Sequence, residues 1–114
     1  MAADDKLTKR FYKAIGREDG VTEKRMMGGI CFMVNGNMVG GADRHEKTQY
    51  GRFMFRVGKN NEAKALGFPD TTIVEQGGRR MGGLVFVDAD KCSSKNLKSL
   101  AKLAMEFVES LPAK

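Results

Sequence analysis

Cysteine and histidine are scarce in this chain of 114 residues, and their scarcity excludes two classes of protein. The two cysteines, Cys31 and Cys92, are too few for the disulfide framework of a small secreted domain. Together with the single histidine, His45, they cannot supply the ligand spacing of a zinc site. The sequence therefore predicts no disulfide scaffold, no metal centre and no cofactor.

Long apolar runs are also missing. The longest run, residues 30–34, is far shorter than the ~20 residues that cross a bilayer. Residues 1–6 hold two aspartates and no apolar segment, a pattern that predicts no secretory signal. We therefore expect a cytoplasmic protein with no membrane partner.

The remaining composition is typical of one folded domain. It is 41% hydrophobic and 30% charged, too apolar for intrinsic disorder, and the length suits a single domain over residues 1–114. The 14 glycines indicate tight turns and close backbone contacts. The formal net charge of +6 permits attraction to nucleic acid but does not require it.

Hydrophobic periodicity predicts an α+β fold, an antiparallel sheet with helices on one side. A helical segment precedes Gly16, and a second helical segment follows the expected N-cap Ser94. Short apolar segments, most of them bounded by glycine, asparagine or polar residues, lie between them. The expected order is a helix ending at Gly16, strands at residues 29–34, 38–42 and 52–57, a short helix at 59–66, strands at 71–75 and 84–87, and a helix at 94–111.

The strongest local signal is a hairpin around Asn35 and Gly36. Both residues tolerate the left-handed conformation that such a turn needs, and apolar runs flank them. In the first of these runs, residues 29–34, both faces are apolar. We expect either a central strand covered on two sides or a strand with one face in a subunit contact.

Candidate catalytic and phosphate-binding residues are weak. Cys31 and His45 could form a nucleophilic pair across the hairpin, but a thiol inside an apolar strand favours a buried, inert cysteine. The glycine pairs lack the order of a phosphate-binding loop, so strand bends and bulges are the better interpretation. We therefore expect no enzymatic activity.

Basic residues form the candidate contact surface. They recur at helical spacing in the first and last helices and as pairs elsewhere, where a solvated helix face is the alternative. No aromatic series is interleaved for base stacking, so contact with a nucleic-acid backbone is favoured over sequence-specific recognition. The candidates are Lys6, Arg10, Lys13, Arg17, Lys24, Arg25, Arg79, Arg80, Lys95, Lys98 and Lys102.

Methionines cluster around the strands and turns. Methionine fills irregular gaps in a core and also suits adaptable interfaces, so the cluster indicates either packing or a partner surface. Its members are Met26, Met27, Met33, Met38, Met54 and Met81.

Four segments resemble the N-terminal domain of the TfoX/Sxy family. Residues 25–38 are similar to that family's Met-Phe-Gly-Gly opening, apolar strand, Asn-Gly turn and return strand. Residues 55–58 contain its Arg-Val-Gly, residues 78–88 resemble its Gly-Arg-Pro-Met-x-Gly turn and strand, and residues 107–112 fit its closing segment. Departures are Met27 in place of phenylalanine and Arg80 in place of proline.

The resemblance implies a bacterial domain with a two-layer α+β fold, related to competence and transcription regulators and here a stand-alone copy of the N-terminal domain. It implies no catalytic residues. We therefore expect a regulatory module that binds a protein partner, with a homodimer as one form of that contact. A module that contacts the nucleic-acid backbone is the alternative, and an enzyme is the least favoured.

Overall fold

A computed structural model describes residues 5–16, 20–26, 29–44, 48 and 50–112, which form three α-helices, a 3-10 helix and one six-stranded sheet. The elements follow the chain in the order helix, four strands, a short helical segment, two strands and helix. Their bounds are α1 Asp5–Ile15, β1 Val21–Met26, β2 Gly29–Val34, β3 Asn37–Arg44, β4 Gly51–Arg56, η1 Lys59–Asn61, α2 Glu62–Leu66, β5 Thr71–Gln76, β6 Arg79–Asp88 and α3 Ser94–Glu109.

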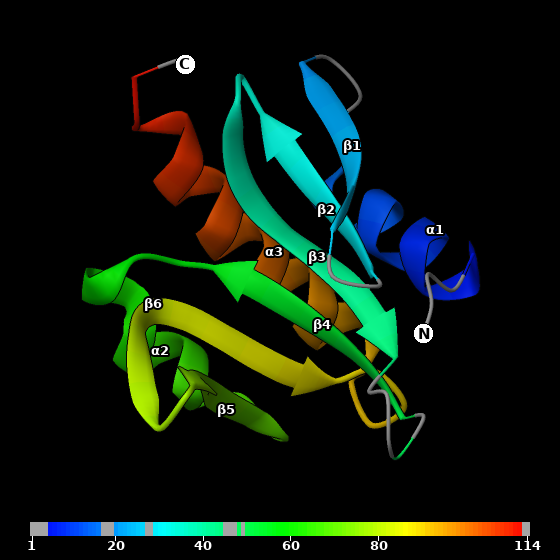
Figure 1. Ribbon diagram of the computed structural model, residues 1–114, viewed down its shortest axis with the longest axis vertical. Coiled ribbons are helices and arrows are strands. Elements are labelled where there is room, and N and C mark those ends of the chain that lie inside the picture. Colours follow the sequence, from blue (N-terminus) through cyan, green and yellow to red (C-terminus); the bar gives the residue numbers. More distant parts are fainter. Residues whose placement is uncertain (1–4, 17–19, 27–28, 45–47, 49, 113–114) are drawn as a thin grey trace.

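All strand pairs in the sheet are antiparallel, and their spatial order is β1-β2-β3-β4-β6-β5. Helices α1 and α3 contact each other and pack on the central strands β3 and β4, while α2 packs on β5 and β6. In Figure 1 both long helices lie behind the sheet, and its other side faces the reader. The predicted α+β class, with helices on one side of an antiparallel sheet, is confirmed.

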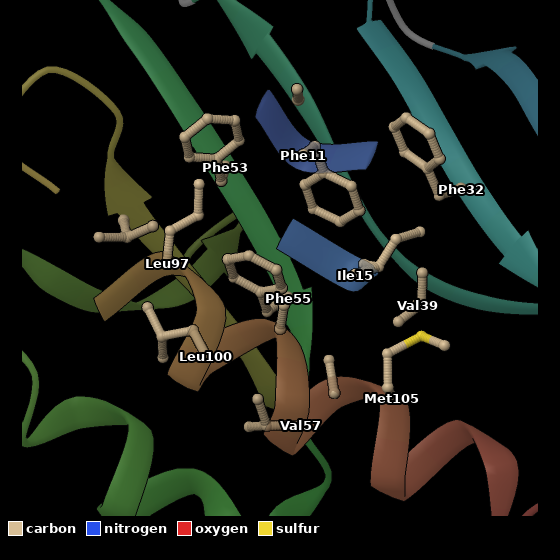
Figure 2. Close-up of a cluster of buried hydrophobic side chains, with 14 of the residues drawn as sticks. Phe11, Ile15, Phe32, Val39, Phe53, Phe55, Val57, Leu97, Leu100 and Met105 are labelled. Carbon is tan, nitrogen blue, oxygen red and sulfur yellow. The ribbon is translucent and has the colours of Figure 1, made fainter. Parts of the chain in front are cut away.

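The core lies between the helices and the sheet (Figure 2). Helix α1 contributes Phe11, whose ring stacks on Phe32 at a centroid distance of 4.6 Å and on Phe55 at 5.0 Å. Strand β4 alternates its side chains, so Phe53 and Phe55 are fully buried under the helices. Leu100 of α3, the second long helix, is also fully buried and packs in this core. Aromatic rings therefore join α1 to the middle of the sheet.

Three details of the secondary structure differ from the predictions. Strand β1 is absent from the predicted elements. Its sequence, Val-Thr-Glu-Lys-Arg-Met, has no apolar run, which is typical of an exposed edge strand. Residues 79–83, expected to be a glycine-rich connection, belong to the ten-residue strand β6. The N-cap of α3 is Ser93, whose hydroxyl accepts from the backbone N–H of Asn96 at 3.1 Å, and not Ser94.

Both predicted hairpins are present. Asn35 and Gly36 have φ values of 53° and 84° at the β2–β3 turn, and Gly77 and Gly78 have values of 60° and 76° at the β5–β6 turn. Each turn uses two residues in the left-handed region, which matches the right-handed twist of the flanking strands. The glycine pair in the second turn is thus explained by chain geometry and not by phosphate binding.

Candidate functional site

The sheet has a second face that no described helix covers. Side chains alternate along β4, so Arg52, Met54 and Arg56 point away from the core that Phe53 and Phe55 enter. The same alternation in β2 places Cys31 on this second face. A strand covered by helices on both sides, one of the two arrangements expected for residues 29–34, is therefore not what the described elements form.

Apolar side chains gather on this second face and surround a hollow of about 430 Å³. They come from β2, β3, β4, β5 and β6, and most are half-buried. We call this surface the open face and define it by Cys31, Met38, Met54, Val74, Met81, Leu84 and Phe86.

Val74 shows that the open face has packing of its own. Its side chain is only 7% exposed, yet it does not belong to the cluster of buried residues beneath the helices. It lines the hollow with Met81 and Leu84 from the neighbouring strand. The open face is therefore an apolar surface that already excludes part of the solvent, and not a row of isolated exposed side chains.

A bidentate ion pair spans β3 and β4 at one edge of the hollow. The Arg52 Nε lies 2.7 Å from one Asp43 oxygen, and its Nη2 donates to the other at 3.1 Å. The guanidinium carbon also lies 4.2 Å from the ring centre of Phe86. The hydrogen bond to Asp43 raises the pKa of Arg52, which stays charged. This arrangement fixes the Arg52 side chain across the face.

Cys31 lies on the open face and is half-buried, so the prediction that it packs in the core is wrong. Burial raises the pKa of its thiol, Asp43 raises it further, and Lys24 on the adjacent strand opposes them. His45 lies outside the described residues, so the expected pairing with Cys31 stays a hypothesis. Cys92 is the cysteine that joins the core cluster.

The basic residues of the two long helices mostly face solvent. Lys6 and Lys13 of α1 are exposed, and so are three lysines of α3. Lys9, absent from the predicted surface, is exposed as well. The spacing of Lys6, Lys9 and Lys13 follows the helix and is sufficient to identify Lys9 from the sequence. We call this set the lysine layer: Lys6, Lys9, Lys13, Lys95, Lys98 and Lys102.

Arg10 does not belong to the solvent-facing set, contrary to the prediction. Its Nη1 donates to the carbonyl of Ala89 at 2.9 Å, and its Nη2 donates to that of Cys92 at 3.2 Å. Its guanidinium carbon lies 5.1 Å from the ring centre of Phe53. These contacts turn the side chain inward and attach α1 to the β6–α3 connection. Arg10 is therefore a structural cation.

The other predicted basic residues do not share the surface of the lysine layer. Lys24 and Arg25 are neighbours on β1, so strand alternation directs them to opposite faces of the sheet. Arg80 forms an ion pair with Glu62 of α2, and Arg79 is exposed at the β5–β6 hairpin. Arg17 lies outside the described residues. The predicted contact surface thus divides into separate groups.

Two of the segments that resemble the TfoX/Sxy family meet in the structure. The backbone N–H groups of Val57 and Gly58 both donate to the carbonyl of Gly83, at 2.9 and 3.2 Å. Gly58 and Gly83 each have a φ of 83°, and a Cβ on Gly83 would lie 3.1 Å from the Gly58 backbone. These glycines permit a close approach of β6 to the end of β4, which is a structural role.

Metal-binding and membrane-spanning features do not occur among the residues that the structure describes. Within the described ranges, no group of three or more histidine, cysteine, aspartate or glutamate side chains could hold a metal ion. Of the helices formed by these residues, none has the length and apolar character needed to cross a bilayer.

Comparisons with known proteins found no matching family model, no matching curated protein and no matching solved structure. The resemblance to the TfoX/Sxy family therefore stays a prediction from the sequence.

Proposed function

We propose that this chain is a regulatory module without catalytic activity that binds a protein through the open face. The observation that supports this proposal most directly is the apolar side of the sheet opposite the helices, with its hollow of about 430 Å³. Contiguous apolar surface of this kind is favourable to remove from water and commonly marks an interaction site. Met38, Met54 and Met81 can adapt to a partner because their side chains are unbranched and polarizable.

The resemblance to the TfoX/Sxy family supports the regulatory part of the proposal. It implies a role beside bacterial competence or transcription regulators, which act through partners and not through chemistry of their own. The structure adds a reason to place the contact on the sheet, since the helical side is occupied by the core and by the lysine layer.

Met54→Asp is expected to abolish partner binding because it places a charge in the centre of the open face. The measurement is affinity capture from a bacterial lysate with the wild type, Met54→Asp and the control Ala63→Asp. Ala63 is exposed on α2, so the control adds the same charge away from the open face. Circular dichroism confirms that both variants are folded. Capture of the same protein in equal amounts by Met54→Asp and the wild type would contradict the proposal.

A second candidate function is contact with a nucleic-acid backbone through the lysine layer. All six lysines are exposed on α1 and α3, and among the described residues none of them forms an ion pair. The carboxylates of the outer surface of α3, Glu106 and Glu109, lie in its last turn. An array of free ammonium groups attracts phosphates without reading the bases.

Binding to duplex DNA by the lysine layer is expected to weaken about 100-fold between 50 and 200 mM salt if about four phosphates are contacted. Fluorescence anisotropy with a labelled duplex measures it. Lys98→Glu combined with Lys102→Glu should lower affinity sharply at low salt, whereas Arg79→Glu on the distant hairpin should lower it less. Binding that is undetectable at low salt, or equally sensitive to Arg79→Glu, would remove this candidate.

A further inference from the structure

The charges of the molecule are distributed unequally between its two sides. The lysine layer contributes six positive charges on the outer surface of the helices. Around the open face, the charges nearly cancel: Asp43, Arg52 and Glu75 line the hollow, and Lys24 lies beside Cys31. Arg56 and Asp88 lie on the same side of their strands as Arg52, so three cations stand with three carboxylates on a chain whose formal net charge is +6.

This distribution of charge favours some classes of partner at the open face over others. A strongly acidic protein would be drawn to the lysine layer and not to a neutral apolar surface. A second copy of this chain would be repelled if the two lysine layers met, but it would meet no net repulsion at the open face. Opposite charges such as Asp43 and Arg52 can also exchange partners across a two-fold axis, because an isologous interface sets each patch against itself.

The second face of the sheet, of which the open face is the apolar part, is just large enough for a dimer. Six strands span five spacings of about 4.8 Å, or about 24 Å, and the six-residue strands β2 and β4 are about 20 Å long. The whole second face of the sheet, β1 included, therefore presents about 500 Å² per copy, and pairing it would bury about 1,000 Å² in total. That area reaches the lower limit of specific protein interfaces.

We propose that the partner at the open face is a second copy of this chain, so that two sheets pack against each other with the helices outermost. The inference rests on the proposed function and specifies its partner. Two twisted sheets pack about 10 Å apart with their side chains interdigitated. The methionines of each copy occupy the hollow of the other, and the Asp43–Arg52 pairs lie at the interface.

The reactivity of the Cys31 thiol tests whether the two sheets pack against each other. Its thiol is half-buried on the open face of one chain and becomes covered when a second chain docks. Cys92 is buried in the core whether or not a dimer forms, so it is removed with Cys92→Ala to leave Cys31 as the single thiol. Because the pKa of the Cys31 thiol is raised by burial, alkylation is measured at alkaline pH, where more thiolate is present.

The experiment combines molar mass by light scattering with the rate of Cys31 alkylation over a range of chain concentrations. The Cys92→Ala protein is expected to approach twice the chain mass of 12.6 kDa as concentration rises. Over the same range its alkylation rate should fall by about tenfold because the thiol loses access to reagent. Adding Met54→Asp should give a monomer that is alkylated at the fast rate at all concentrations, whereas adding Ala63→Asp should change neither result.

A monomer whose alkylation rate does not depend on concentration would overturn the inference. A dimer with unchanged Cys31 reactivity would also overturn it, because the contact would then lie elsewhere. A monomer that still captures a protein in a manner sensitive to Met54→Asp would refute the second copy and leave the proposed function standing. A monomer that captures nothing would refute both.

Discussion

Phe11→Ala is expected to lower the free energy of unfolding by about 3–5 kcal/mol. The Phe11 side chain is fully buried, and its ring lies between those of Phe32 and Phe55 (Figure 2). Alanine would remove these ring contacts and leave a cavity between α1 and the sheet. The sheet and α3 are already packed against each other, so they cannot close the gap.

Chemical denaturation followed by circular dichroism measures the loss. Lys13→Ala is the control, because Lys13 is exposed on the same helix and its replacement should change stability by less than about 0.5 kcal/mol. A loss below about 1 kcal/mol for Phe11→Ala would show that α1 is not part of the cooperative core.

Gly40→Ala is expected to lower the free energy of unfolding by about 3 kcal/mol or more. A Cβ at this position would lie 2.0 Å from the carbonyl oxygen of Met54 and 2.9 Å from Cζ of Phe11. The oxygen belongs to the backbone of the neighbouring strand, so it can move only if the β3–β4 pairing is distorted. The overlap adds to a backbone cost, because side chains rarely occur at the positive φ of 158° that Gly40 adopts.

Gly16→Ala measures the free-energy cost of a left-handed backbone without the cost of steric overlap. Gly16 has a φ of 64°, and nothing lies within 4 Å of the position that a Cβ would occupy there. Alanine at this site should cost about 1 kcal/mol because of the left-handed backbone alone. Denaturation midpoints of the two variants and the wild type give the comparison. If Gly40→Ala were as mild as Gly16→Ala, the close approach of β3 to β4 would be wrong.

The sequence predicts those helices and strands whose turn residues, caps and apolar pattern all indicate the structure that the fold contains. The hairpin at Asn35 and Gly36 is correct because the turn residues and the flanking apolar runs indicate the same structure. β1 is missed because its polar residues form an edge strand held mainly by backbone pairing with β2. The strand β6 is longer than predicted because its glycines serve close approach to Gly58 and do not end the strand.

The candidate site is harder to predict because it depends on contacts between distant segments. The apolar residues on both sides of strand 29–34 do signal a second apolar face, but periodicity alone does not say whether a helix covers it. Arg10 has the same spacing as a solvent-facing lysine, and its inward contacts with Ala89 and Cys92 depend on the folded path of the chain. The spacing of residues along a helix predicts which side of the helix they share. It does not predict which residues of other elements they contact.

The attachment of α1 through Arg10 also sets an order of events during synthesis. The carbonyl groups that Arg10 binds lie 79 and 82 positions further along the chain, and α3, against which α1 packs, follows them. Translation proceeds at about 5–20 residues per second, so the acceptors of Arg10 and the α3 partner of α1 emerge several seconds after α1 is made. Phe11 can meet Phe32 and Phe55 earlier, but a nascent chain that stops before residue 89 lacks both the acceptors of Arg10 and the α3 surface against which α1 packs.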